Sequence, residues 1–248
     1  MYNKFSYFLL AALFLFGCKK DETTEAVVST VIPKVNIHVS NEVDGTPIIP
    51  GNGNYTNANG ELYTVNLLKY YIGHITLIDE NGNEVALNDH DLIDVADPTS
   101  LIIAKTNVPN AHYVSLRFNL GIEESHNHTG DQEGELDPIF GMIWTWDTGY
   151  IFFKHEGSFI NSMGDNGPIV YHYGTDEAFV TVEKPISFHG SGNEVNLDLH
   201  FNLNALYADP NMVVFEGNNA HQSSGAGDIP WINDLKENFT QAFSVDVQ

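Results

Sequence analysis

The dominant pattern of the chain beyond residue 34 is an alternation of apolar and polar residues. It is clearest between residues 195 and 203, where every second residue is Val, Leu or Phe and the residues between them are Asn, Asp or His. A period of two is typical of β-strands that bury one face. The same pattern recurs in residues 35–39 and 114–120 and, in shorter runs, in residues 71–78, 150–153, 169–173, 178–182 and 186–189.

Turn-forming clusters rich in Gly, Asn and Ser separate these runs, for example Asn81-Gly82-Asn83 and Gly190-Ser191-Gly192. Many strands without long helices between them predict an all-β protein, an antiparallel β-sandwich with long loops. The segments 40–60 and 121–141 are rich in Gly, Asn and acidic residues, and we expect them to be those loops. Long loops of compact β domains are frequent places for binding sites.

One short helix is expected near the C-terminus. Pro230 suits a first helical position, and Ile232, Leu235, Phe239 and Phe243 follow at spacings of three and four. These spacings place the apolar side chains on one face. The sequence therefore predicts a helix that packs on the sandwich or closes one end of it.

The N-terminal residues resemble a lipoprotein signal. Lys4 precedes an apolar run from residue 8 to residue 16, which ends in Leu15-Phe16-Gly17-Cys18 and is short for a membrane span. We expect residues 1–17 to be a signal peptide, Cys18 to carry a lipid, 18–33 to be a flexible tether, and 34–248 to be one domain. This organisation predicts an outer-membrane lipoprotein that is periplasmic or surface exposed.

Charge and cysteine content narrow the range of functions. The 248 residues include 33 acidic and 10 basic side chains, for a net charge of −23. Such a chain lacks the basic surface by which proteins attract nucleic acid or anionic membranes, so we expect no nucleic-acid partner. The single cysteine, Cys18, excludes an internal disulfide.

The common catalytic motifs are missing from the sequence. It contains no Gly-x-Ser-x-Gly elbow, no phosphate-binding loop and no His-Glu-x-x-His helix. Glu133 and Glu135 could suggest glycoside hydrolysis, but two acids two residues apart in a loop are weak evidence for the required geometry. We therefore expect a protein that is not an enzyme.

Histidines are more numerous than Lys and Arg together, at 11 against 10. His126 and His128 lie in the acidic loop, His38 lies on the polar side of its strand, and His172 lies in a short strand. Imidazole suits copper, zinc, iron and nickel. Each histidine taken alone is explained by solvation or capping, whereas the group is equally consistent with a metal site.

The segment around two tryptophans is the most unusual part of the chain. In a strand, Met142, Trp144 and Trp146 would project from one face, which gives either a stripe of oxidisable groups or ordinary core packing. This segment and others resemble the MbnP-like family, the methanobactin-associated copper-binding proteins. The resemblance runs from about residue 34 to 245 and rests on Leu68-Lys69-Tyr70-Tyr71-Ile72, Phe118-Asn119-Leu120-Gly121-Ile122, Gly134-Glu135-Leu136-Asp137-Pro138, the stretch from Gly141 to Tyr150, His155-Glu156-Gly157 and Tyr171-His172-Tyr173-Gly174.

The resemblance implies a copper-binding β-sandwich of the cell envelope. In the family's named member a partner dihaem peroxidase (MbnH) oxidises a tryptophan to kynurenine, whose amine helps to bind copper beside histidine. On this sequence the modified residue would be Trp144 or Trp146. The histidines at matching positions would be His38, His128 and His172, with His126 as a neighbour.

Two classes of function follow. The first is a non-catalytic, membrane-anchored copper-binding protein in which the histidines converge near the tryptophans. The second is a surface β-sandwich without metal that contacts carbohydrate or protein, with Trp144, Trp146 and Tyr150 as core or contact residues.

Overall fold

The computed structural model describes residues 33–130, 132–145, 148–190, 194–223 and 226–248. The predicted signal peptide, the lipidation site Cys18 and nearly all of the predicted tether lie outside these residues. The helices are α1 (Glu124–Asn127), α2 (Leu203–Leu206) and α3 (Ile229–Ala242). The strands are β1 (Lys34–Val43), β2 (Thr46–Pro47), β3 (Tyr55–Thr56), β4 (Leu62–Asp79), β5 (Glu84–Ala86), β6 (His90–Asp94), β7 (Ile102–Asn107), β8 (His112–Leu120), β9 (Ile143–Thr145), β10 (Gly149–Ile160), β11 (Asn166–Gly174), β12 (Val180–His189), β13 (Glu194–Asn202), β14 (Ala220–His221) and β15 (Phe243–Val247).

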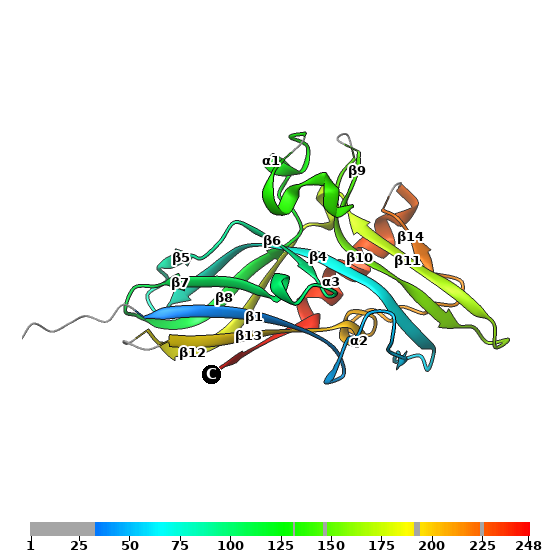
Figure 1. Cartoon of the computed structure of the whole chain (residues 1–248), viewed down its shortest axis with the longest axis horizontal. Helices are drawn as coiled ribbons and strands as arrows, with labels where there is room; N and C mark the ends of the chain where they lie inside the picture. The colour runs from blue at the N-terminus through cyan, green and yellow to red at the C-terminus, as the bar shows by residue number, and fades with distance from the viewer. Residues whose placement is uncertain (1–32, 131, 146–147, 191–193, 224–225) are drawn as a thin grey trace, which may run out of the picture. The chain divides into compact units, whose positions relative to one another are not determined.

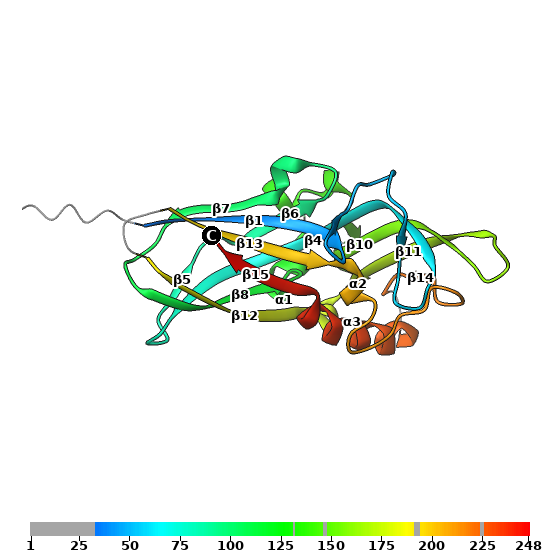
Figure 2. The ribbon, with the colours of Figure 1, turned by 90° about the horizontal axis from the view of Figure 1, so that it is seen from below.

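Two sheets form an open, sandwich-like all-β fold, as the sequence predicts (Figures 1 and 2). The five-stranded sheet has the order β15-β13-β1-β2, with β7 also paired to β1. The ten-stranded sheet has the order β12-β8-β4-β10-β11-β14, and the short strands β3, β5, β6 and β9 pair with β4 or β10.

The sheets are mixed rather than purely antiparallel. β1 and β13 run parallel, with Lys34 opposite Glu194, and β11 and β14 also run parallel. Alternation along a strand reports which face is buried, but it carries no information about the direction of the neighbouring strand. The antiparallel expectation is therefore corrected at these two pairs.

Burial follows the predicted alternation in β13. Leu197, Leu199 and Phe201 are fully buried, whereas His200 between them is partly exposed. The central strand β4 departs from alternation, because Tyr70, Tyr71 and Ile72 are all buried. The hydroxyl of Tyr71 donates to the backbone carbonyl of Glu135, so the segment around residue 135 covers the outer face of β4.

Helix α3 confirms the expected C-terminal helix. Pro230 lies in its first turn, and Ile232, Leu235 and Phe239 are buried. The ring of Phe239 lies 5.3 Å from that of Phe153 in the ten-stranded sheet and 6.4 Å from that of Phe201 in the five-stranded sheet. The helix therefore packs against both sheets. Phe243, expected in the helix, begins β15 instead.

The two predicted loops contain short elements. Residues 40–60 include the end of β1 and the strands β2 and β3. Residues 121–141 include α1 and two single-turn 3-10 helices, and α1 stands beside β9 at one edge of the fold (Figure 1). Among the described residues, no helix is long and apolar enough to cross a membrane.

Candidate metal centre

His74 lies at a β-bulge in β4. The register between β4 and β8 shifts between Gly73 and Thr76, and His74 has a φ of +50°. Left-handed backbone is uncommon for residues other than glycine, and bulges of this kind re-aim a side chain out of the regular alternation. The backbone N–H of His74 donates to the carbonyl of Asp89 at 2.6 Å. The bulge is thereby tied to the segment that leads into β6.

His90 is the first residue of β6 and lies directly opposite Gly73. Its side chain is 8% exposed. A Cβ atom on Gly73 would lie 3.0 Å from Cδ2 of His90, so the imidazole packs over bare backbone. The rings of His74 and His90 are 5.1 Å apart between centroids and inclined at 68°. Neighbouring strands thus bring together two histidines that are sixteen residues apart in the sequence.

Glu123 supplies a carboxylate between these two imidazoles. Its Oε2 lies 3.1 Å from Nε2 of His74 and 2.8 Å from Nε2 of His90. The three atoms that could bind a metal all lie within 4.8 Å of one another. Ligand bonds near 2 Å require donor atoms about 3–4 Å apart, so this spacing needs only a small contraction.

The hydrogen bonds to Glu123 keep its carboxylate ionised. Partial burial, the largest single influence, acts to raise the pKa of Glu123. Hydrogen bonds from His90, from its own backbone and from His74, together with the charge of His90, outweigh burial and lower the pKa to about 2. The group is therefore an anion at neutral pH, which is the form that binds a cation.

His126 adds a third imidazole. It lies in α1, three residues after Glu123, and its Nδ1 pairs with Oε1 of that carboxylate. Its ring lies 5.6 Å from the ring of His90. His74, His90, Glu123 and His126, named here the histidine–carboxylate cluster, combine imidazole and carboxylate donors. Such a donor set suits borderline transition metals such as copper and zinc.

Asn127 links this cluster to the tryptophan segment. It is the last residue of α1 and is 1% exposed. Its Oδ1 accepts a hydrogen bond from the backbone N–H of Tyr150 at 2.7 Å, and its Nδ2 donates to Asp176 at 2.7 Å. A Cβ atom on Gly149, where φ is +87°, would lie 2.4 Å from Oδ1 of Asn127. The start of β10 is thereby fixed against the helix that carries His126.

Trp144 lies in β9, which pairs with the start of β10. Its side chain is partly buried, and its indole Nε1 is buried without a hydrogen-bond partner among the described residues. The ring lies so close to Gly174 that a Cβ atom there would be 2.8 Å from Cζ3. Met142, on the same short segment, is 1% exposed and belongs to the core. Trp146 lies outside the described residues.

The structure places the four histidines predicted as ligands in different surroundings. His126 belongs to the histidine–carboxylate cluster. His128 follows α1, and its Nε2 lies 3.0 Å from Oδ2 of Asp176. His172 in β11 lies 2.9 Å from a carboxylate oxygen of Glu156, and His38 in β1 lies 3.8 Å from one of Asp198.

The structure does not bring His38 and His172 together. The neighbours of His38 in β1, Ile37 and Val39, are buried in the core, as are Tyr171 and Tyr173 on either side of His172. Because side chains alternate along a strand, both imidazoles project outward, each from a different sheet of the sandwich. The two histidines cannot serve one metal ion in this arrangement.

Sequence reasoning missed His74, His90 and Glu123. One signal was available, since Gly73-His74 interrupts the apolar alternation of its strand. The pairing of Gly73 with His90 and the approach of Glu123 from another segment depend on strand register and loop path. Neither is visible in a single sequence.

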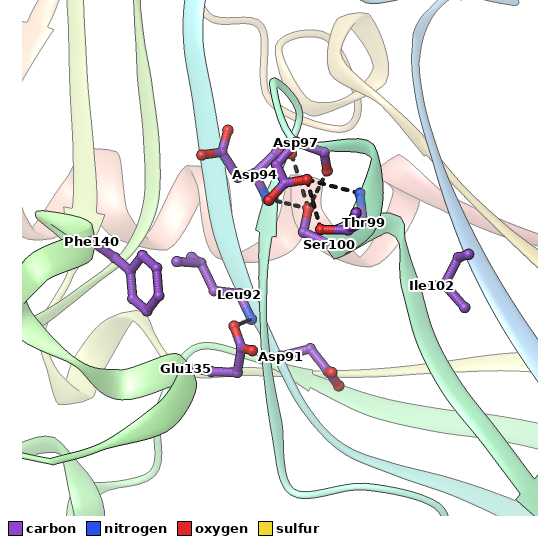
Figure 3. Close-up of a pocket in the computed structure, with 9 residues that line it drawn as sticks. All are labelled: Asp91, Leu92, Asp94, Asp97, Thr99, Ser100, Ile102, Glu135 and Phe140. Carbon is purple, nitrogen blue, oxygen red and sulfur yellow. Dashed lines mark hydrogen bonds between the residues drawn. The ribbon is translucent and has the colours of Figure 1, made fainter.

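An acidic cavity of about 200 Å³ lies along β6, and Asp91, which follows His90 in the chain, is one of its lining residues. Figure 3 shows the carboxylates of this cavity between Phe140 and Ile102; they belong to Asp91, Asp94, Asp97 and Glu135. Burial and then the charge of Glu135 raise the pKa of Asp91 to about 7. The carboxylates of this cavity and the net charge of −23 both favour the approach of cations.

The fold and the cluster define an all-β protein with a surface histidine–carboxylate site. A family model described as MbnP matches residues 33–224. This match covers most of the chain, and the protein belongs to the MbnP family.

A solved structure supports the same assignment of the fold. It is MbnP from Methylosinus trichosporium, which is similar over 86% of this chain and 98% of its own, with 15% sequence identity and a TM-score of 0.59. At this identity the likeness concerns the fold. The comparison with curated proteins finds no match.

Proposed function

We propose that this member of the MbnP family is a non-catalytic copper-binding protein and that its metal site is the histidine–carboxylate cluster. One observation carries the proposal: the donor atoms of His74, His90 and Glu123 lie within 4.8 Å of one another. His126 is placed to become a further ligand or to hold the carboxylate, because it pairs with the other oxygen of Glu123.

The donor set explains how the site would hold the cation. Glu123 now accepts hydrogen bonds from the imidazoles, and a cation between these groups takes the place of the shared protons. Binding requires neutral imidazoles, so copper affinity should be lost in acid as protons compete for the same nitrogens. Copper is favoured over zinc and nickel because Cu²⁺ has the highest affinity for such sites. The resemblance to methanobactin-associated copper-binding proteins points to the same metal.

Trp144 is the described candidate for oxidation to kynurenine by a partner dihaem peroxidase. Its strand is joined through Tyr150 and Asn127 to the helix of His126, and its indole N–H has no hydrogen-bond partner among the described residues. Trp146 remains the other candidate. Intact-mass analysis of protein from its native host tests this proposal, since kynurenine has one carbon fewer and one oxygen more than tryptophan. An unchanged mass in a host that expresses such a peroxidase contradicts it.

We also propose that Cys18 anchors the protein to the outer membrane through a lipid. The apolar run that ends at the single cysteine supports this proposal. A Cys18→Ala variant should lose membrane retention and still fold, because no disulfide depends on the thiol. Equal retention of the variant and the natural chain would contradict the anchor.

A second candidate function is protein contact without metal. Ile139 is 82% exposed, and it precedes Phe140, which lines the acidic cavity and is 39% exposed. Exposed apolar side chains around a charged hollow are typical of interaction surfaces. Tyr150 is 1% exposed and packs in the core, so it offers no face on which a sugar ring could stack.

Copper titration with three variants tests the metal site. His90→Ala and Glu123→Gln should each abolish or strongly weaken the tightest copper binding, while folding is followed by circular dichroism. His172→Ala is the matched control, because this histidine also lies 2.9 Å from a carboxylate but outside the cluster. Loss of the tight site in His172→Ala, with retention in His90→Ala, would refute the assignment.

A further inference from the structure

A second pair of histidines meets across two other strands. His112, the first residue of β8, lies directly opposite His189, the last residue of β12. Their rings are stacked, with centroids 4.3 Å apart and planes inclined by 21°. The pair lies at the far end of β8 from Leu120 and the cluster, a separation of eight residues or about 26 Å along the strand.

The buried neighbours of the pair fix its orientation. Tyr113 and Phe188 are also directly opposite each other, and both are buried with rings 5.1 Å apart. Because side chains alternate, anchoring Tyr113 and Phe188 in the core directs His112 and His189 to the opposite, outer face. Residues directly opposite in an antiparallel pair have Cβ atoms about 4.5–5.5 Å apart, close enough for two imidazoles to bind one ion.

Glu80 prepares one of these imidazoles for a metal. Its Oε2 lies 3.1 Å from Nδ1 of His112, and its backbone N–H donates to the carbonyl of His112 at 2.9 Å. A carboxylate can only accept, so it holds the proton on Nδ1 and leaves the lone pair on Nε2. Metal-binding histidines are oriented by carboxylates in this same way.

The remaining nitrogen of His112 faces a group that can be displaced. Its Nε2 lies 3.1 Å from the hydroxyl of Ser187, which donates to the lone pair when Glu80 holds the Nδ1 proton. Ser187 and His189 are exposed, and the side chain of His112 is 25% exposed. An incoming ion therefore meets an accessible lone pair and a second imidazole that is free of core packing.

We propose that His112 and His189 form a second metal site, for a borderline divalent ion of which Cu²⁺ binds most tightly. Nε2 of His112 and one nitrogen of His189 are the protein ligands, and Glu80 is the positioning residue. The rings turn out of their stack so that both lone pairs point to the ion, and water fills the other positions. With two protein ligands, this site is weaker than the histidine–carboxylate cluster and independent of it.

Calorimetric titration of the full chain with Cu²⁺ near pH 7.5 tests the proposal. The natural chain should bind a tighter and a weaker equivalent. His189→Ala and His112→Gln should each remove the weaker equivalent, and Glu80→Gln should weaken it by about tenfold or more. His90→Ala should leave the weaker equivalent in place. The two sites can therefore fail separately. If His90→Ala loses the tighter equivalent of copper while His189→Ala keeps the weaker one, the result supports the histidine–carboxylate cluster alone.

His200→Ala is the matched control for a strand histidine without a histidine opposite. The residues opposite His200 on the neighbouring strands are Ser40 and Ser244. The His200→Ala variant should therefore bind both equivalents of copper. A second readout is the NMR spectrum, in which substoichiometric Cu²⁺ should broaden the ring signals of His112 and His189. The proposal would be overturned if His189→Ala or His112→Gln kept the weaker equivalent of copper. It would also be overturned if the natural chain bound a single equivalent of copper and His189→Ala left that binding intact.

Discussion

Gly73 lies directly opposite His90 across the β4–β6 pair, and a Cβ atom on Gly73 would lie 3.0 Å from Cδ2 of the imidazole and 3.1 Å from the carbonyl of Asp89. Contacts this short are tighter than protein packing normally allows. The absence of a side chain at residue 73 is therefore what lets His90 reach Glu123.

A Gly73→Ala substitution should displace His90 and weaken copper binding at the cluster by about tenfold or more, since shifts of supporting groups have effects of this size. The measurement is the affinity of the tighter copper site, with circular dichroism as a check of the fold. Gly227→Ala is the control, because a Cβ atom there meets nothing within 4 Å. Unchanged affinity in Gly73→Ala would show that His90 is not a ligand.

Glu123 should make the free energy of unfolding depend on pH in the acid range. Its pKa is lowered from 4.5 to about 2 in the folded chain, so its stabilising contribution is present above pH 4.5 and is lost as the pH falls toward 2. Urea unfolding of metal-free protein should show a steeper loss of stability over this range for the natural chain than for Glu123→Gln. Parallel pH profiles would contradict the ionised, hydrogen-bonded carboxylate.

Asp91 should have the opposite effect. Burial, with the charge of Glu135, raises its pKa from 3.8 to about 7, so the folded state holds a proton that the unfolded state releases. The free energy of unfolding therefore falls, through this group, as the pH rises from about 4 to 7. An Asp91→Asn variant should match the natural chain near pH 4 and be more stable at pH 8. If the two proteins differed in stability by the same amount at pH 4 and at pH 8, the result would argue against a raised pKa of Asp91.

The register of β13 predicts unequal effects of two adjacent substitutions. Leu199 is fully buried, and Leu199→Ala should cost about 2–5 kcal/mol. His200 points to the other face, where Nδ1 lies 2.6 Å from the hydroxyl of Ser40, and His200→Ala should cost about 1 kcal/mol. Thermal and urea unfolding measure both. Similar costs at the two positions would refute the assigned register.

Local sequence signals predicted the elements whose burial depends on their own residues. The alternation at Leu197, Leu199 and Phe201 predicted a half-buried strand, and the spacing after Pro230 predicted α3. The parallel pairing of β1 with β13 was not predictable, because alternation is identical in parallel and antiparallel strands. The end of α3 was also missed, since Phe243 is buried equally well by a strand.

The candidate site shows the same division. His126 could be selected from its acidic loop, but nothing in its own segment identifies its partners. His74 reaches the cluster through a bulge with left-handed backbone, and His90 reaches it because β6 pairs with β4 at Gly73. Register and bulges are set by side chains packed along whole strands, which a local pattern does not encode.

By itself, the sequence determined the all-β class, the buried faces of the strands, the C-terminal helix and the resemblance to the MbnP-like family. The class, the buried faces and the helix depend on the order of apolar and polar side chains, because burial of apolar surface drives them. The resemblance rests instead on motifs such as the stretch from Gly141 to Tyr150. Only the tertiary structure decided that His74, His90, Glu123 and His126 meet, and that His38 and His172 point away from each other. A metal site is a set of distances between atoms from separate segments, and such distances exist only after the strands have paired and the loops have packed.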